Sequence, residues 1–192
     1  MRRIGIYGGT FDPIHLAHLI FADRAREQLS LDKVLFLPAA IPPHKQGKGI
    51  SDGKRRLEMV EIAIAAHPSF EANPIELNRS GVSYTIDTLR DLTNEYPGDE
   101  LILLVGADML MDFPNWREPE AILQMARIAY AERPGVHIEH SLPHDRIVQI
   151  AMAPFDLSST EIRARVHEGK TIRYVVPAGV EAYIHAHGLY RD

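Results

Sequence analysis

Two glycines and two histidines lie close together near the start of the chain, in the segment Gly8-Gly-Thr-Phe-Asp-Pro-Ile-His-Leu-Ala-His18. Paired glycines let a backbone turn sharply and approach a phosphate closely. His15 and His18 are three residues apart, so on a helix they share one face near its positive end. Two imidazole donors and the backbone N–H groups of a helix start would together bind a polyphosphate.

Other interpretations of this segment stay open. Asp12 followed by Pro13 has the chemistry of a helix entry, with proline at a position whose N–H would be unpaired. The simplest interpretation is therefore a tight turn followed by a helix with water-exposed histidines. A zinc site would need further ligands, and the chain has no cysteine and no H-E-x-x-H pattern. The P-loop and the G-x-G-x-x-G dinucleotide pattern are both absent.

A second polar segment, Ser158-Ser-Thr-Glu-Ile-Arg163, lies near the other end of the chain. Ser158 and Glu161 have the spacing of a capping box at a helix start, which by itself needs no further explanation. Ser159 and Thr160 add hydroxyl groups at the positive end of that helix. Arg163 gains nothing from the helix dipole there, so we expect it to face an anion.

The elements that must position these segments alternate along the chain. Apolar runs predict strands at Arg2–Tyr7, Lys33–Pro38, Leu101–Val105, Arg127–Glu132 and Ile147–Met152. Helical spacing predicts a helix at Leu16–Leu29 and further helices around residues 57–64 and 86–92. The segment Ala39–Gly53 is rich in proline, glycine and lysine and is expected to be a mobile loop.

This alternation predicts an α/β fold, a Rossmann-like doubly wound parallel sheet with a small C-terminal helical appendage. We expect a single domain over residues 1–192, with the sheet core in 1–153 and a helical subdomain in 154–192 that closes over one end of the sheet. Ligands of such sheets lie beyond the carboxyl ends of the strands. The turns at Gly8-Gly9 and at Gly106 should therefore face the ligand.

Composition excludes several classes of protein. The net charge is −5, so no broad basic face predicts nucleic-acid binding, and positive charge for a phosphate ligand should be concentrated in a pocket. No run of apolar residues is long enough for a membrane span, and no signal-peptide pattern is present. The absence of cysteine excludes disulfides. We expect a cytoplasmic protein without membrane partners. A homo-oligomer is compatible with the sequence, which does not determine the oligomeric state.

Both polar segments resemble the signatures of the nucleotidylyltransferase superfamily, G-x-F-D-P-x-H-x-G-H and I-S-S-T-x-x-R. Ala17 stands where the superfamily usually has glycine, and Leu157 replaces isoleucine. The resemblance implies that the two histidines hold the phosphates of ATP, with Mg²⁺ accompanying the nucleotide. The ATP site it implies includes Gly8, Gly9, Thr10, Phe11, Gly106, Asp108, Arg133, Ser158, Ser159 and Thr160. His15, His18 and Arg163 are the expected catalytic residues.

Further segments resemble the nicotinate mononucleotide adenylyltransferase branch. They are Leu37-Pro-Ala-Ala-Ile-Pro-Pro-His-Lys45, Ser83-Tyr-Thr85, Gly106-Ala-Asp108 with Phe113-Pro-Asn-Trp116, and Arg133-Pro-Gly135. The resemblance implies that Lys45, Tyr84, Thr85 and Trp116 bind the mononucleotide. Five of the residues named so far also have a simpler interpretation: a surface lysine for Lys45, a helix cap for Thr85 and Asp108, core packing for Trp116 and a surface charge for Arg133.

The function implied is transfer of the adenylyl group of ATP to nicotinate mononucleotide, giving nicotinate adenine dinucleotide and pyrophosphate. Because the mononucleotide phosphate is already ionised, such an enzyme needs only positioning and charge neutralisation. Phosphopantetheine adenylyltransferase shares both signatures and is the nearest alternative enzyme. A preference for the amide mononucleotide and a non-catalytic nucleotide sensor are further alternatives.

Overall fold

The structure is a computed structural model that describes residues 1–41, 49–79, 81–131, 142–153 and 155–191. Its centre is a parallel sheet of six strands in the order β3-β2-β1-β4-β5-β6. The strands are β1 (Arg3–Gly9), β2 (Lys33–Pro38), β3 (Phe70–Ala72), β4 (Glu100–Gly106), β5 (Ala126–Ala131) and β6 (Ile147–Gln149). The order reverses between β1 and β4, so the predicted doubly wound Rossmann-like sheet is confirmed.

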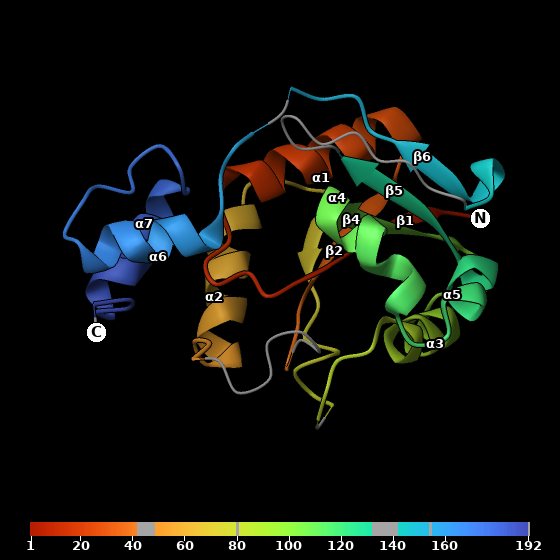
Figure 1. Ribbon diagram of the computed structural model, residues 1–192, viewed down its shortest axis with the longest axis horizontal. Helices are drawn as coiled ribbons and strands as arrows, with labels where there is room; N and C mark the ends of the chain where they lie inside the picture. Colours follow the sequence, from red (N-terminus) through yellow and green to blue (C-terminus); the bar gives the residue numbers. More distant parts are fainter. Residues whose placement is uncertain (42–48, 80, 132–141, 154, 192) are drawn as a thin grey trace.

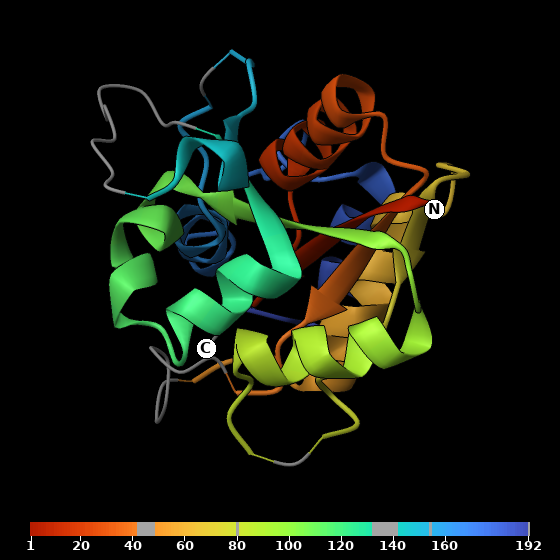
Figure 2. The same cartoon turned by 90° about the vertical axis from the view of Figure 1, so that its right-hand side faces the viewer.

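Helices cover both faces of this sheet. One face packs against α1 (Leu16–Leu29) and α2 (Gly53–Ile64), and the other against α3 (Thr85–Glu95) and α5 (Pro119–Met125). In Figure 2 the orange α1 and the yellow-green α3 lie on opposite sides of the strands. Strand side chains alternate between the two cores: Val34 and Phe36 join the α1 side, whereas Leu35 and Leu37 join the α3 side. Such strands, buried on both faces, are continuous apolar runs.

The C-terminal part consists of α6 (Ser159–His167) and α7 (Ala178–Ala186), which lie at one end of the molecule beyond α2 (Figure 1). This part packs on α2 and on the turn that follows β1 at the carboxyl end of the sheet. The Leu16 N–H donates to the Val175 carbonyl (3.0 Å), and the Tyr183 hydroxyl donates to the Glu58 carboxylate. That this part forms a subdomain closing over one end of the sheet stays a prediction. The edge strands of the sheet are β3 and β6.

Several strand and helix boundaries agree closely with the sequence. The helix Leu16–Leu29 and the strand Lys33–Pro38 are found as predicted, and the apolar run after Leu101 is a central strand between β1 and β5. The elements missed are short: β3, α4 (Ala107–Asp112) and α5 have three, six and seven residues. Such lengths are too short for a periodic pattern to emerge.

Two local predictions are wrong. Asp12-Pro13 is not the helix entry, because α1 begins at Leu16 with His15 as its N-cap. Strand β6 ends at Gln149 instead of Met152. The cause of the second error is tertiary: the N–H and the carbonyl of Ala151 are bonded to the side chain of Gln28 on α1 (2.9 and 2.8 Å). That pairing takes the chain out of the sheet.

Among the described residues, no helix is both long enough and apolar enough to cross a membrane.

Tyr190, near the chain end, fastens the C-terminal part to the turn after β1. Its hydroxyl donates to Asp12 Oδ1 (2.7 Å), and the buried Asp12 carboxylate also accepts from the Ser51 N–H (3.2 Å). Burial first, and then the nearby Asp12 charge, raise the pKa of Tyr190, so the hydroxyl stays a donor. The contact joins residues 178 positions apart.

Replacing Tyr190→Phe should lower the free energy of unfolding by about 1–3 kcal/mol, because a buried carboxylate loses a donor. Urea denaturation followed by circular dichroism measures the change. Tyr174→Phe is the matched control, since Tyr174 is 84% exposed. Equal stability of the two variants would show that the Asp12 bond contributes nothing to docking.

Candidate active site

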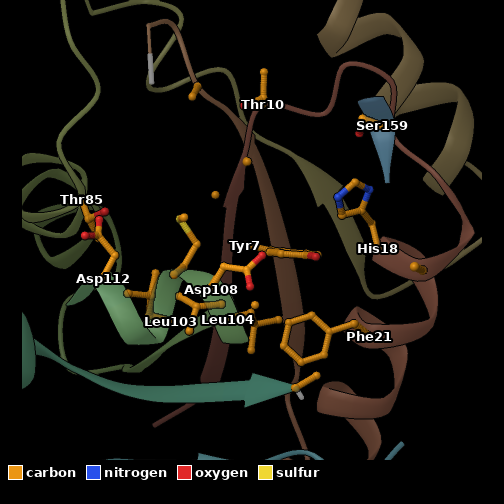
Figure 3. Close-up of a pocket in the computed structure, with 18 of the residues that line it drawn as sticks. Tyr7, Thr10, His18, Phe21, Thr85, Leu103, Leu104, Asp108, Asp112 and Ser159 are labelled. Atoms are coloured by element: carbon orange, nitrogen blue, oxygen red, sulfur yellow. The ribbon is translucent and has the colours of Figure 1, made fainter. Parts of the chain in front are cut away.

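A cleft of about 610 Å³ opens beyond the carboxyl ends of β1 and β4, the place where the strand order reverses. Figure 3 shows its two sides: His18 and Ser159 on one, Thr85 and Asp112 on the other, with Asp108 and Tyr7 between them. Leu103 and Leu104 of β4 form part of its floor. The volume falls within the range typical of small-molecule sites.

The first glycine turn forms the upper edge of the cleft. Gly8, Gly9 and Thr10 line it, whereas Phe11 is 2% exposed and lies beneath the turn. Phe11 has a positive φ of 48°, and its ring packs edge-on against Tyr7 and His18. A Cβ built on Gly9 would lie 2.8 Å from that ring. Gly9 is therefore required by the packing of Phe11, and Phe11 supports the cleft without lining it.

His15 and His18 both line the cleft at the start of α1. Their rings stack at a centroid distance of 3.6 Å, with His15 buried. The backbone N–H of His15 donates to Nδ1 of the His18 ring (3.2 Å). A neutral His18 ring therefore carries its proton on Nε2, which makes that nitrogen a hydrogen-bond donor.

The second polar segment converges on the same turn. Ser158, Ser159 and Thr160 line the cleft, and Ser158 caps α6 by accepting from the Glu161 N–H (3.2 Å). Ser159 Oγ donates to the Pro13 carbonyl (2.9 Å). Segments more than 140 positions apart thus share one wall.

Arg163 is bonded to two neutral oxygens of the protein, and its contact with a ligand anion stays a prediction. Its guanidinium donates to the Asp12 carbonyl (2.8 Å) and to Thr160 Oγ1 (3.3 Å). The residue is partly buried and is not among those that line the cleft. In this structure Arg163 therefore links α6 to the first turn.

The opposite wall carries the third group of predicted residues. Tyr84 is the N-cap of α3 and Thr85 its first residue, and both line the cleft. Trp116 also lines it, partly buried against Phe113 at a centroid distance of 5.4 Å. Asp108, in the first turn of α4 after Gly106, is exposed at the cleft.

Two predicted site residues, Lys45 and Arg133, lie outside the described residues. The described residues contain no group of three or more His, Cys, Asp or Glu side chains that could hold a metal ion.

Arg117 is the cation that the sequence analysis missed. It lines the cleft beside Tyr84, with Cζ 4.9 Å from the centre of the Tyr84 ring. Its guanidinium also lies 3.5 Å from Asp87 and 3.8 Å from Glu118. Its position directly after Trp116 was the only available signal, and one arginine in a polar stretch is not distinctive.

Glu76 was also missed, and it lines the cleft while only 7% exposed. Burial raises the pKa of its carboxyl group, against the opposing effect of hydrogen bonds from Thr88 and Ser83. Thr88 Oγ1 donates to Glu76 Oε1 (2.8 Å). A glutamate between two loop-like segments carries no sequence signal, so only the fold reveals it.

This arrangement can bind an anion on one side and a flat ring on the other. Helices α1, α3 and α6 all begin at the cleft, so the positive ends of their dipoles lie there. His18 adds a donor on the phosphate side, and Trp116 adds an aromatic face on the other.

Comparison with known proteins agrees with this geometry. The model of the cytidylyltransferase-like family matches residues 6–165. The chain is 40% identical to nicotinate-nucleotide adenylyltransferase of Bacillus subtilis, with all of both chains covered. It is 46% identical to a protein of Thermus thermophilus named probable nicotinate-nucleotide adenylyltransferase, over 98% of this chain and 100% of that one.

Solved structures share the fold. Nicotinic acid mononucleotide adenylyltransferase of Plasmodium falciparum, complexed with NaAD, superimposes with a TM-score of 0.85 at 21% identity. The same protein complexed with APC gives a TM-score of 0.82 at 20% identity. Each comparison covers 99% of this chain and 98% of that one.

Gly9→Ala should lower the free energy of unfolding by about 1–3 kcal/mol, since the added methyl overlaps a ring that Tyr7 and His18 hold in place. Gly8→Ala is the matched control for stability, because a Cβ there meets no atom within 4 Å. Urea denaturation of both variants measures the difference. If Gly9→Ala is as stable as Gly8→Ala, Phe11 is not what fixes the turn.

Proposed function

The chain belongs to the nicotinate-nucleotide adenylyltransferases of the cytidylyltransferase-like family, and we propose how its cleft transfers the adenylyl group of ATP to nicotinate mononucleotide. The observation that carries the proposal is the convergence of two distant segments on one wall: His18 after β1 and Ser159 at the start of α6. Thr85 and Trp116 form the opposite wall. One cleft thus offers a phosphate side and a pyridine side.

On the phosphate side, ATP would lie along the first turn. The N–H groups after Gly8 and Gly9 and the Nε2 proton of His18 are placed to donate to triphosphate oxygens. Ser158, Ser159 and Thr160 add hydroxyl and N–H donors from α6. Arg163 adds a positive charge beside Thr160, on the side that we assign to the leaving pyrophosphate.

On the other side, the mononucleotide would place its ring against Trp116 and its carboxylate at the start of α3. Thr85 offers a hydroxyl and backbone N–H groups there, and Arg117 offers a positive charge. Asp108 stays assigned to ATP, where it would accept from a ribose hydroxyl. Lys45 and Arg133 remain assigned to the mononucleotide and to ATP, respectively, as predicted from the sequence.

The chemistry needs no residue to act as nucleophile. An oxygen of the mononucleotide phosphate forms a bond to the α-phosphorus of ATP, and the bond from that phosphorus to the bridging oxygen breaks. Pyrophosphate leaves with the electron pair of the broken bond. The enzyme contributes alignment of the two phosphates and donors for the charge that develops on them. His18 and the start of α6 supply those donors.

We propose that Mg²⁺ enters with the triphosphate. It would neutralise charge on the phosphate oxygens. The donor set fits this role, because Asp108 and Asp112 line the cleft as single carboxylates and form no closed metal cage. We also propose that residues 1–192 act as one unit, because Ser159 and Arg163 of the C-terminal part are bonded to the first turn. A cytoplasmic location and function without nucleic-acid or membrane partners complete the proposal.

Pyrophosphate release from ATP tests this function directly. The purified chain is incubated with ATP and Mg²⁺ together with nicotinate mononucleotide, nicotinamide mononucleotide or phosphopantetheine. We expect turnover with the nicotinate form, and chromatography should identify nicotinate adenine dinucleotide. Turnover with phosphopantetheine alone would reassign the enzyme, and turnover with none would favour a nucleotide sensor.

His18→Ala should lower kcat by about 100- to 1,000-fold, the usual cost of losing one preorganised donor to developing charge. The loss of thermal stability should be small by comparison, because His18 is only partly buried. His185→Ala, which alters an exposed histidine on α7, is the matched control. Near-normal turnover of the His18 variant would remove this residue from the mechanism.

Arg117→Leu should lower kcat/KM for nicotinate mononucleotide about two- to fivefold while leaving the nicotinamide form nearly unchanged. The effect is modest because Arg117 is about half exposed, and an exposed charge pair contributes up to about 1 kcal/mol. Parallel assays with both mononucleotides measure the ratio. Arg90→Leu is the control, since Arg90 pairs with the same Asp87 and Glu118 but does not line the cleft. Equal ratios in the two variants would exclude Arg117 from acid recognition.

A further inference from the structure

Arg56 on α2 is the largest fully buried side chain among the described residues, with 1% of its surface exposed. Its guanidinium is bonded to backbone carbonyls. Nε donates to Ser51 (2.9 Å), Nη1 to Thr10 (2.7 Å) and Nη2 to Ala39 (2.7 Å), with a longer bond from Nη2 to Ala40 (3.4 Å). Burial lowers the pKa of Arg56, and the nearby Asp12 carboxylate opposes that shift. A buried guanidinium is retained only where such partners compensate its desolvation.

The carbonyls belong to three segments that are separate in sequence. Thr10 is in the phosphate-side turn after β1, and Ala39 and Ala40 follow β2. Ser51 precedes α2, and its N–H donates to the Asp12 carboxylate. One planar group therefore fixes the ends of two adjacent strands and the approach to α2 at the same time.

A second set of buried bonds continues from Ala40 to the opposite wall. The Ala40 N–H donates to Ser83 Oγ (3.0 Å), and Ser83 directly precedes Tyr84 and Thr85. Glu76, beside Ser83, receives a hydrogen bond from Thr88 of α3 (2.8 Å). The path from Thr10 through Arg56 and Ala40 to Ser83 thus joins the two walls of the cleft.

The buried polar residues support the importance of this path. Those found among the described residues are Asp12, His15, Arg56, Glu76, Ser83 and Thr88. Asp12 and His15 lie in the first turn, Arg56 and Ser83 lie on the path, and Glu76 and Thr88 form a bonded pair next to Ser83. Polar groups are costly to bury, so their concentration at one place indicates that a defined geometry is maintained there.

We propose that Arg56 is a positioning residue for the transfer reaction, which sets the separation between the ATP turn and the wall that holds the mononucleotide. The inference rests on the proposed function. Arg56 touches neither ligand site directly, since it is not among the residues that line the cleft. Its effect is on the alignment of the two phosphates, and a misplacement of about 1 Å can cost about 100-fold in rate.

Lysine cannot replace this guanidinium. An ammonium group donates from a single point, whereas the carbonyls of Ser51, Thr10 and Ala39 are reached from three different nitrogens. Arg56→Lys keeps the charge and much of the volume but loses the three separate donor nitrogens that reach these carbonyls. We expect kcat to fall about 10- to 100-fold. The KM values for both substrates should stay within about threefold, because the contacts to each separate ligand are kept.

A purely structural role would also lower the measured rate, by reducing the folded fraction. Rates are therefore divided by the number of ligand-binding sites, which titration calorimetry with a non-reactive methylene analogue of ATP determines. Arg55→Lys, on the exposed surface of the same helix, is the matched control. Wild type is assayed in parallel. If it forms no dinucleotide, the proposed function fails, and this outcome is distinct from a loss of rate in the Arg56 variant only.

Ser83→Ala breaks the same path on its far side and tests the proposal independently of the folding of the Arg56 variant. It should lower kcat per site about 3- to 10-fold, and combining it with Arg56→Lys should cost less than the product of the two effects. The proposal is overturned if Arg56→Lys turns over within twofold of wild type per site. It is also overturned if the two effects multiply, or if the Arg56 variant binds no analogue while Ser83→Ala retains full turnover.

Discussion

Three helices begin at the edge of one cleft, and the electrostatics of the site depend on that convergence. The chain has a net charge of −5. The described residues lining the cleft include three acidic residues, Glu76, Asp108 and Asp112, and a single arginine, Arg117. Side-chain charge among these residues therefore does not explain how a polyphosphate would be attracted. The positive ends of α1, α3 and α6 explain how a polyphosphate would be attracted to the cleft. They meet there because, in a parallel sheet, the helices that follow strands begin at the carboxyl edge.

A turn that must leave its N–H groups available to a ligand has to be held by its other atoms. The structure does this from beneath and from outside. Arg56 binds the Thr10 carbonyl from beneath, while Arg163 and Ser159 bind the carbonyls of Asp12 and Pro13 from the C-terminal helices. Tyr190 binds the Asp12 side chain. Each of these contacts uses an acceptor of the turn.

The winding of the sheet explains why one cleft can align two different ligands. The phosphate-side turn leads from β1 to α1, which packs on one face of the sheet, whereas Thr85 begins α3 on the other face. The two halves meet where the strand order reverses between β1 and β4. The ladder between β1 and β4 joins the two halves, and the hydrogen bonds from Arg56 to Ala39 and from Ala40 to Ser83 connect them further.

The sequence alone determined the fold class, most of the central elements and the two polar segments. Continuous apolar runs and helical spacing are local signals, so Lys33–Pro38 and Leu16–Leu29 could be predicted to the residue. The residues of the two signatures could be named because their types and spacing are unusual. Ser158, Ser159, Thr160, His15 and His18 do meet at one cleft.

Only the tertiary structure decided how these residues are held and which others join them. Phe11 lies beneath the turn, Arg163 is bonded to a carbonyl, and Glu76, Arg117 and Arg56 gain their roles from partners distant in sequence. The end of β6 was misjudged for the same reason, since a side chain of α1 captures Ala151. Burial and long-range hydrogen bonds depend on what packs nearby, and no local pattern of residues encodes that neighbourhood.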